Sequence, residues 1–482
     1  MGQRSRKFAQ RMAQGGILLC LLASGCRRSP EVYPSVEGPL SNSEGLRIGL
    51  VSSFLPLYGR RASSVGVNAS YLLRDRVNQC GGVNQAPISF VVEQADNAPR
   101  SEVAATRDLI DEYRVHGAIA NLSSVEPQQS LGEFVSAQVP VLLFTHPSTV
   151  VDVTSLKMRV QKSQTSQHYL GQLSPSHENL SQALAQVIWG QGYTQVAFIR
   201  VDNASSEQWA DNFTETFEAL GGQRVDTENP IFVPRYSNFQ RQINSALNVE
   251  SDEASAEGDR LIEPFRFDSS QSVQLSAWLD QEQTAVVVVL DRFRSSDFLQ
   301  ALDPMAATRE SVSLFWADWL ELKAVWNRRA TDLTDSSDSD RPWLTGAAGL
   351  TPAIVGDGFS TFKQAWVSHF DEAPPAEAAY AWDAASLFAL AAEAAGSNGG
   401  SSIATHLQAI ASPPGIVVTD VCEGLKHLRA GEEINYQGAS GALNLDAKGT
   451  VESRFDLWRI SPENELKIID RVTPEADSPA TP

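Results

Sequence analysis

The sequence has few of the side chains on which metal and nucleophilic chemistry depend. Its 482 residues include only four Cys and seven His. The histidines are scattered, with no HExxH motif, and no CxxC pair or Cys/His cluster suggests zinc. Neither a P-loop nor a GxGxxG fingerprint is present. We therefore expect no metal and no cofactor.

One segment, Gly438–Gly441, places a serine between glycines, as the nucleophile turn of a hydrolase does. Its spacing does not match GxSxG, and such a hydrolase needs an acid and then a histidine after the serine. No histidine follows Ser440. The sequence therefore predicts a protein that is not an enzyme.

Basic residues are also scarce. Lys and Arg number 38 against 58 Asp and Glu, which gives a net charge of -20. Binding to phosphate backbones or to anionic membrane surfaces draws mainly on clustered basic residues, so we expect no nucleic-acid partner. Hydrophobic residues make up 42% of the chain, enough for a large core in two or three domains or in one bilobed protein.

Long apolar runs are absent except near the N-terminus. Four basic residues precede the run Ile17–Leu22, which is too short to span a membrane, and small residues follow it. This order is typical of a cleaved export signal. The segment Ala23-Ser24-Gly25-Cys26 resembles a bacterial lipobox, which implies a lipid on Cys26 and a periplasmic or cell-envelope protein anchored to a bacterial membrane. An ordinary secretory signal with an unmodified Cys26 is the alternative.

Two cysteines remain once Cys20 leaves with the signal and Cys26 carries lipid. Cys80 and Cys422 then form an even pair in an oxidising compartment. We predict a long-range disulfide between them. Two separate buried thiols fit the sequence equally well, because sequence alone cannot show whether the residues meet.

Strand and helix patterns alternate from Arg47 onward, after a Pro-, Ser- and Gly-rich stretch typical of a flexible tether. Apolar runs predict strands, and helical spacing of apolar residues predicts the helices between them. The expected strands are 48–51, 88–92, 117–120, 140–144, 195–199 and 285–290, and the expected helices include 101–113, 180–188, 209–220, 297–302 and 376–395. Such alternation predicts an α/β fold with parallel sheets. Polar insertions are expected at 250–271 and 331–340.

Several segments, read in order, resemble the type 1 periplasmic binding proteins of the branched-chain amino-acid (Leu/Ile/Val) class, the solute receptors of ABC importers. The resemblance covers about residues 47–460. It rests on Pro56-Leu57-Tyr58-Gly59, Val77–Val83, Gln94–Pro99, Leu122-Ser123-Ser124, Val139-Pro140 leading to Thr145-His146-Pro147, Ala378–Ala384, and Tyr436–Gly441 with Asp446 and Gly449.

The resemblance implies two doubly wound Rossmann-like lobes joined by three crossings, with a ligand held at the carboxyl ends of the strands. We expect a signal peptide at 1–25, a tether at 26–45, lobe 1 at 46–160 and 348–430, lobe 2 at 161–347 and 431–470, and a disordered tail at 471–482.

The resemblance also assigns candidate ligand contacts. Ser124 and Thr145 match hydroxyl positions for a carboxylate, and Ser123 and His146 adjoin them. Asp318 matches the acid that binds the ligand ammonium. Trp316 is a candidate for the apolar wall, and Ser205 stands where the family has an aromatic contact. The alternatives are a helix cap for Ser124 or Asp318, and a turn-stabilising role for Thr145 or His146.

The function that this resemblance implies is capture of a small polar ligand, an amino acid or related amide, by lobe closure for an ABC permease. The membrane would be contacted through the lipid anchor. An envelope sensor or regulatory lipoprotein that uses the same fold to contact a signalling or cell-wall partner is the alternative.

Overall fold

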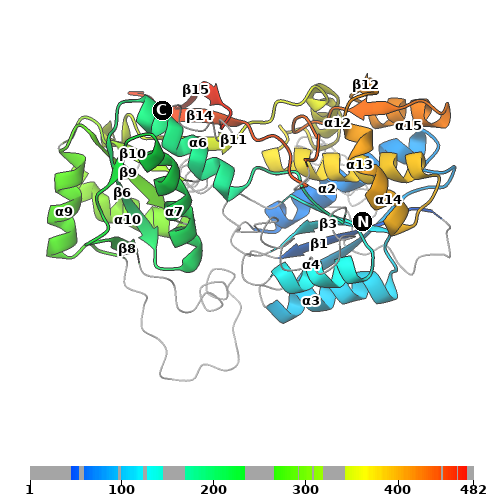
Figure 1. Cartoon of the computed structure of the whole chain (residues 1–482), viewed down its shortest axis with the longest axis horizontal. Helices are drawn as coiled ribbons and strands as arrows, with labels where there is room; N and C mark the ends of the chain where they lie inside the picture. The colour runs from blue at the N-terminus through cyan, green and yellow to red at the C-terminus, as the bar shows by residue number, and fades with distance from the viewer. Residues whose placement is uncertain are drawn as a thin grey trace, which may run out of the picture. The chain divides into compact units, whose positions relative to one another are not determined.

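Strands and helices alternate along most of the described chain (Figure 1). The computed structural model describes residues 45–53, 59–95, 99–122, 127–144, 169–233, 265–290, 292–306, 309–317, 342–446, 449–463 and 465–474. The predicted signal peptide, the lipidation site Cys26 and nearly all of the tether lie outside these residues. None of the described helices is long and apolar enough to cross a membrane.

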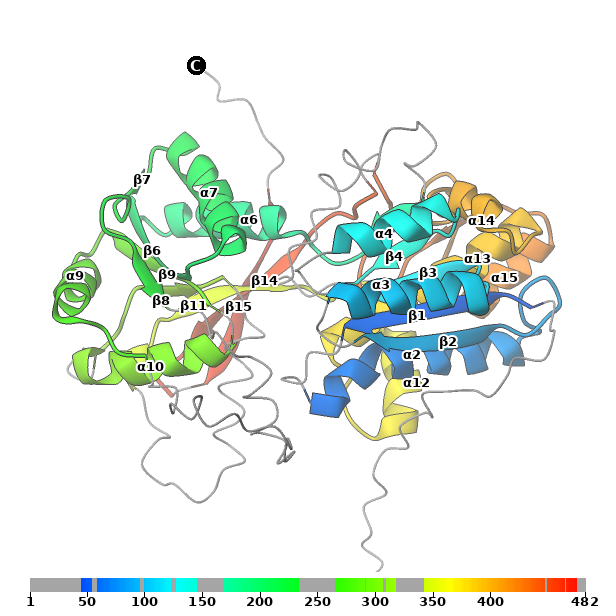
Figure 2. The ribbon, with the colours of Figure 1, turned by 90° about the horizontal axis from the view of Figure 1, so that it is seen from below.

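The first sheet is entirely parallel, with strand order β2-β1-β3-β4-β5. Its strands are β1 (Arg47–Ser53), β2 (Ser89–Ala95), β3 (Gly117–Asn121), β4 (Val141–Leu143) and β5 (Leu170–Gln172). Helices α3 (Pro99–Arg107) and α4 (Pro127–Ser136) cover one face, and α2 (Gly59–Gln79) and α13 (Ala376–Ala395) cover the other (Figures 1 and 2). Helices on both faces explain why the strands read as continuous apolar runs.

The Ala-rich helix α13 is buried along most of its length. Its residues from Ala378 to Ala392 are all buried, which suits a helix that is apolar all round. Small side chains let it approach its neighbours closely. A Cβ on Gly117 in β3 would lie 2.6 Å from a ring carbon of Phe388, so the sheet also needs a glycine at this contact.

A disulfide joins the end of α2 to the start of α15 (Val421–Arg429). The Cα atoms of Cys80 and Cys422 are 5.8 Å apart, and the two residues are 342 apart in sequence. Beside the bond, Nε of Arg76 donates to Asp420 at 2.7 Å. The structure therefore contains the predicted cross-link, with an ion pair next to it.

The second sheet has the order β15-β14-β11-β10-β9-β6-β7, with β8 beside β6. Its strands are β6 (Gln195–Val201), β7 (Gln223–Arg224), β8 (Ile231–Val233), β9 (Thr284–Val289), β10 (Leu314–Trp316), β11 (Ala348–Pro352), β14 (Phe455–Ile460) and β15 (Leu466–Val472). Among these described strands, the pairs β11–β14 and β14–β15 are antiparallel, and the other pairs are parallel. Helices α6 (His177–Gly190) and α7 (Ala204–Ala219) cover one face, and α9 (Ser269–Leu279) and α10 (Arg292–Ala306) cover the other (Figure 2).

In the part of the chain that the structure describes, three segments connect the two lobes. We call residues 173–176 the first crossing, 353–358 the second crossing and 437–454 the third crossing; 447 and 448 in the last lie outside the described residues. The prediction of two doubly wound lobes joined by three crossings is thereby confirmed.

Strand pairing moves the lobe boundaries from their predicted positions. β5 pairs with β4, so 170–172 belong to the first sheet although 161–347 was predicted as lobe 2. β11 pairs with β10 and β14, which places 348–352 in the second sheet. β13 (Ile434–Tyr436) pairs with β12 (Ile416–Val418) in a separate two-stranded sheet rather than with lobe 2.

The chain ends also differ from the prediction. β15 continues to Val472, past the predicted start of the tail at 471.

The first predicted insertion, 250–271, overlaps the start of α9, where Asp268 and Gln271 form a capping box. The remainder of that insertion up to 264, and the insertion at 331–340, lie outside the described residues.

Candidate ligand site and hinge

The carboxyl ends of β1, β3 and β4 lie at one edge of the first sheet. The strands are parallel, with Ser52 opposite Asn121 and Ala120 opposite Leu143. The chain therefore leaves β3 and β4 at the same edge, where open α/β sheets place their ligands. Ser123 and Ser124 follow β3, and Thr145 and His146 follow β4; all four lie outside the described residues.

The same arrangement recurs in the second sheet. β9 and β10 are parallel neighbours, with Val288 opposite Trp316. Asp318 comes two residues after β10 and lies outside the described residues.

Trp316 itself is fully buried in the core of the second lobe. Its indole N–H donates to Ser295 at 3.4 Å, and its ring meets Phe298 edge-on. In the structure this side chain packs in the core, and a ligand contact for it stays a prediction.

The junction of β6 and α7 has a cap that the sequence analysis missed. The Asn203 side chain accepts from the backbone N–H of Ser206 at 2.8 Å, and the Ser206 hydroxyl donates to the carbonyls of Val201 and Asn203. The backbone of Ser205 lies in the first turn of α7. An Asn directly before a helical run is the signal that would have identified the cap.

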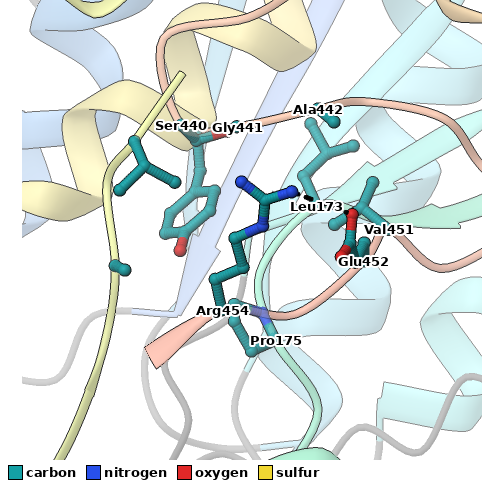
Figure 3. Close-up of a pocket in the computed structure, with 11 residues that line it drawn as sticks. Leu173, Pro175, Ser440, Gly441, Ala442, Val451, Glu452 and Arg454 are labelled. Carbon is teal, nitrogen blue, oxygen red and sulfur yellow. Dashed lines mark hydrogen bonds and ion pairs between the residues drawn. The ribbon is translucent and has the colours of Figure 1, made fainter. Parts of the chain in front are cut away.

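A pocket lies where the three crossings meet (Figure 3). The pocket is open to solvent, and the empty space at its mouth and inside it together measures about 370 Å³. It is lined by Leu173 and Pro175 of the first crossing, Ala353 and Val355 of the second, Ser440, Gly441, Ala442, Val451, Glu452 and Arg454 of the third, and Tyr380 of α13. Because every crossing contributes, we call it the hinge pocket.

Arg454 extends into the hinge pocket toward the loop that carries Ser440 and Gly441 (Figure 3). Its Nη2 lies 3.3 Å from a carboxylate oxygen of Glu452, and both side chains are about half exposed. Solvent screening makes such a pair weak. The pair therefore adds little to the stability of the third crossing.

Asp383 of α13 holds the start of the third crossing. Its side chain is fully buried. The carboxylate accepts from the backbone N–H groups of Ala439 at 2.8 Å and Ser440 at 2.7 Å, and from the Ser440 hydroxyl at 2.6 Å. Burial raises the pKa of Asp383 to about 6, although these hydrogen bonds act in the opposite direction. The Gly438–Gly441 segment thus supplies donors to a buried acid.

No group of three or more His, Cys, Asp or Glu side chains within the described ranges is placed to hold a metal ion.

The family model described as the receptor family ligand binding region matches residues 68–463, which is most of the chain. The chain belongs to this family. A search of curated protein sequences finds no match.

Solved structures of the same fold share little sequence with the chain. A branched-chain amino acid ABC transporter periplasmic ligand-binding protein from Burkholderia xenovorans has a TM-score of 0.60 at 13% identity, over 89% of this chain and 96% of that one. A branched-chain amino acid transporter substrate-binding protein from Streptococcus pneumoniae, in complex with isoleucine, has a TM-score of 0.58 at 14% identity, over 89% and 100%. An ABC transporter solute-binding protein from R. palustris, in complex with benzoate, has a TM-score of 0.58 at 12% identity, over 90% and 98%. The fold is that of type 1 periplasmic binding proteins.

Proposed function

We propose that this protein captures a small carboxylate-bearing solute, an amino acid or related compound, by closure of its two lobes, and delivers it to an ABC permease. The observation that carries the proposal is the fold itself. A parallel sheet and a mostly parallel sheet, in a family of ligand-binding regions, are joined by three crossings that meet at one hinge pocket. Isoleucine and benzoate, bound in two proteins of this fold, share a carboxylate.

Within this proposal the ligand contacts are those predicted from sequence. Ser124 and Thr145, with Ser123 and His146 beside them, take the carboxylate, and Asp318 pairs with an ammonium group. Removing the charge of Asp318 would leave a buried cation with a neutral partner, so Asp318→Asn should weaken binding of an amino acid by about 2 to 5 kcal/mol. Isothermal titration calorimetry measures the change, and unchanged affinity would show that Asp318 is only a helix cap.

A thermal-shift screen tests the proposed function directly. The mature protein is heated with amino acids, amides, aromatic acids and short peptides. A solute present at 100 times its Kd stabilises the folded protein by about 2.7 kcal/mol, which is readily detected. If no solute shifts the transition while the protein is pulled down with a kinase or a cell-wall synthase, the sensor alternative replaces the importer.

Lipidation of Cys26 would place the protein in the periplasm or cell envelope, on the surface of a bacterial membrane. Cys26→Ser should release the protein into the soluble fraction, because the anchor is lost while the folded domain is unchanged. Mass spectrometry of the N-terminal peptide is the accompanying control. A wild-type protein that is soluble and carries an unmodified Cys26 would exclude the anchor.

A further inference from the structure

The segment Gly438–Gly441 has a role that solute capture alone does not explain. Asp383 receives three hydrogen bonds from it, and the carboxylate leaves no room for a side chain beside it. A Cβ on Gly438 would lie 2.4 Å from Oδ2 of Asp383 and 2.6 Å from a methyl carbon of Leu443. Only glycine allows the backbone to come this close to the carboxylate.

The same segment in turn holds the second crossing. The N–H of Gly358 donates to the carbonyl of Gly438 at 3.0 Å, and the N–H of Val355 donates to the carbonyl of Ser440 at 3.3 Å. A Cβ on Gly356 would lie 1.9 Å from the Gly438 carbonyl oxygen. Asp383 of α13 therefore binds the third crossing, and the third crossing in turn binds the second crossing.

The two crossings are joined again on the side of the second lobe. There the N–H of Ala353 donates to the carbonyl of Arg454 at 2.8 Å. The second crossing is thus held at Ala353 and again from Val355 onward, and the third crossing is held at 438–440 and at 454. Between these points the third crossing has further contacts with both lobes. The Gln408 amide donates to the carbonyl of Leu445 at 2.9 Å, and the N–H of Gln172 donates to the carbonyl of Gly449 at 2.7 Å. On the side of the second lobe, the Asn179 amide donates to the hydroxyl of Ser453 at 2.7 Å.

We propose that Asp383 is a positioning residue for solute capture, because it clamps the second and third crossings to the first lobe and so fixes the pivot about which the lobes close. The clamp itself is independent of the identity of the solute; its effect on affinity rests on the proposed function.

Asp383→Asn is the main test. An asparagine has one carbonyl oxygen, so its NH2 group must face at least one of the N–H donors that now point at the carboxylate. Gly438→Ala places a methyl group against the Asp383 carboxylate and so disrupts the same contact from the third crossing. Ser440→Ala removes one donor, keeps both backbone donors, and should fold even where the other two variants do not. The matched control is Gly132→Ala, since a Cβ on Gly132 in α4 meets nothing within 4 Å.

The first readout needs no solute. Hydrogen exchange in the mature protein should become at least about tenfold faster at the amides of Ala439 and Ser440 in Asp383→Asn and Gly438→Ala, with a smaller change in Ser440→Ala. Amides of β1 should stay as protected as in wild type. Spin labels on cysteines placed at the exposed Glu112 and Glu282, one on each lobe, should give a broader distance distribution in the variants. Wild-type exchange and wild-type distances in all three variants would overturn the clamp.

The second readout is the Kd for a solute found in the thermal-shift screen, measured well below the melting temperature. We expect at least a tenfold weaker Kd in Asp383→Asn and Gly438→Ala, and no change in Gly132→Ala. A core variant such as Phe134→Leu, with the same loss of melting temperature, should keep the wild-type Kd. Faster amide exchange with an unchanged Kd would overturn the positioning role. If no solute binds, the proposed function is contradicted, and the hydrogen-exchange and spin-label measurements alone test the clamp.

Discussion

Two arginines on neighbouring strands of the second sheet differ sharply in how their charge is paired. Arg224 of β7 stacks over Phe198, and its Nε and Nη2 contact the two oxygens of Asp226 at 2.8 and 3.2 Å. Asp226 is fully buried. Arg200 of β6 stacks over Phe232, and its Nη2 donates to Glu207 at 2.6 Å. Nε and Nη1 of Arg200 are buried with no hydrogen-bond partner.

Replacing each arginine by methionine should therefore have unequal effects. Arg224→Met leaves the carboxylate of Asp226 buried with a neutral partner, which should lower the stability of the second lobe by about 3 to 5 kcal/mol. Arg200→Met frees Glu207, whose side chain is 51% exposed and can turn to water, and removes two unpaired donors. We expect a change within about 1 kcal/mol of wild type there, chiefly from the lost ring contact.

Native-state hydrogen exchange at β6 and β9 amides measures the opening free energy of the second lobe for each variant. The double variant Arg224→Met/Asp226→Leu serves as the control, because replacing both partners by apolar groups is often close to neutral. It should recover most of the loss. Equal losses in the two single variants, or no recovery in the double variant, would refute the reasoning from burial and pairing.

Three further predictions concern the first lobe. His116, whose Nδ1 accepts from the backbone N–H of Arg47 at 3.0 Å, should titrate near its lowered pKa of about 4, because burial and then the Arg47 charge disfavour the imidazolium. The native state then binds a proton less readily than the unfolded chain, so this group's contribution is full above about pH 6.5 and is lost as the pH falls toward 4; NMR titration checks it. The denatured but unreduced protein should show no alkylation at Cys80 or Cys422, and removing a cross-link over 342 residues should lower stability by up to about 6 kcal/mol; alkylation of either cysteine would disprove the disulfide. Gly117→Ala should destabilise by about 1 to 3 kcal/mol through overpacking against Phe388, while Gly132→Ala should be neutral or slightly stabilising in thermal denaturation.

Local periodicity was enough to predict most of the elements. The run Gln195–Ile199 lies within β6, and the Ala-rich run Ala376–Ala395 is α13 from its first residue to its last. In both cases the pattern reflects burial on all sides, which the sequence displays directly. The alternation of such segments also predicted the doubly wound lobes.

Strand pairing across the crossings could not be read in the same way. β5 has three residues, Leu170–Gln172, and nothing in them distinguishes an edge strand of the first sheet from the start of the second lobe. β11 reaches the second sheet through pairing with β10 and β14, and the last of these lies about a hundred residues later in the chain. Pairings between distant segments decide the lobe boundaries, and single-sequence patterns do not contain them.

In the candidate site, too, local sequence position was informative whereas side-chain packing was not. The sequence position of Ser124, Thr145 and Asp318 after predicted strands assigned them to the carboxyl edges of the sheets, since parallel strands end at a common edge. All three lie outside the described residues, so their role stays a prediction. Sequence position did not predict that Trp316 packs in the core, because a strand covered on both faces buries its alternate residues on opposite sides. Phe315 indeed belongs to one core cluster of the second lobe and Trp316 to the other.

Ser440 illustrates why a motif needs its surroundings before it can be given a chemical role. Its residue type and glycine neighbours superficially match a nucleophile turn, and an acid does lie 2.6 Å from its hydroxyl. That acid is fully buried and already accepts two backbone N–H groups, from Ala439 and from Ser440 itself. The Ser440 hydroxyl donates a hydrogen bond to this carboxylate, which also holds the backbone of the segment, and Ser440 is itself buried. Position 438 requires a glycine because the Asp383 carboxylate occupies the space that a side chain would fill. This glycine is therefore explained by its contact with Asp383 rather than by a nucleophile turn.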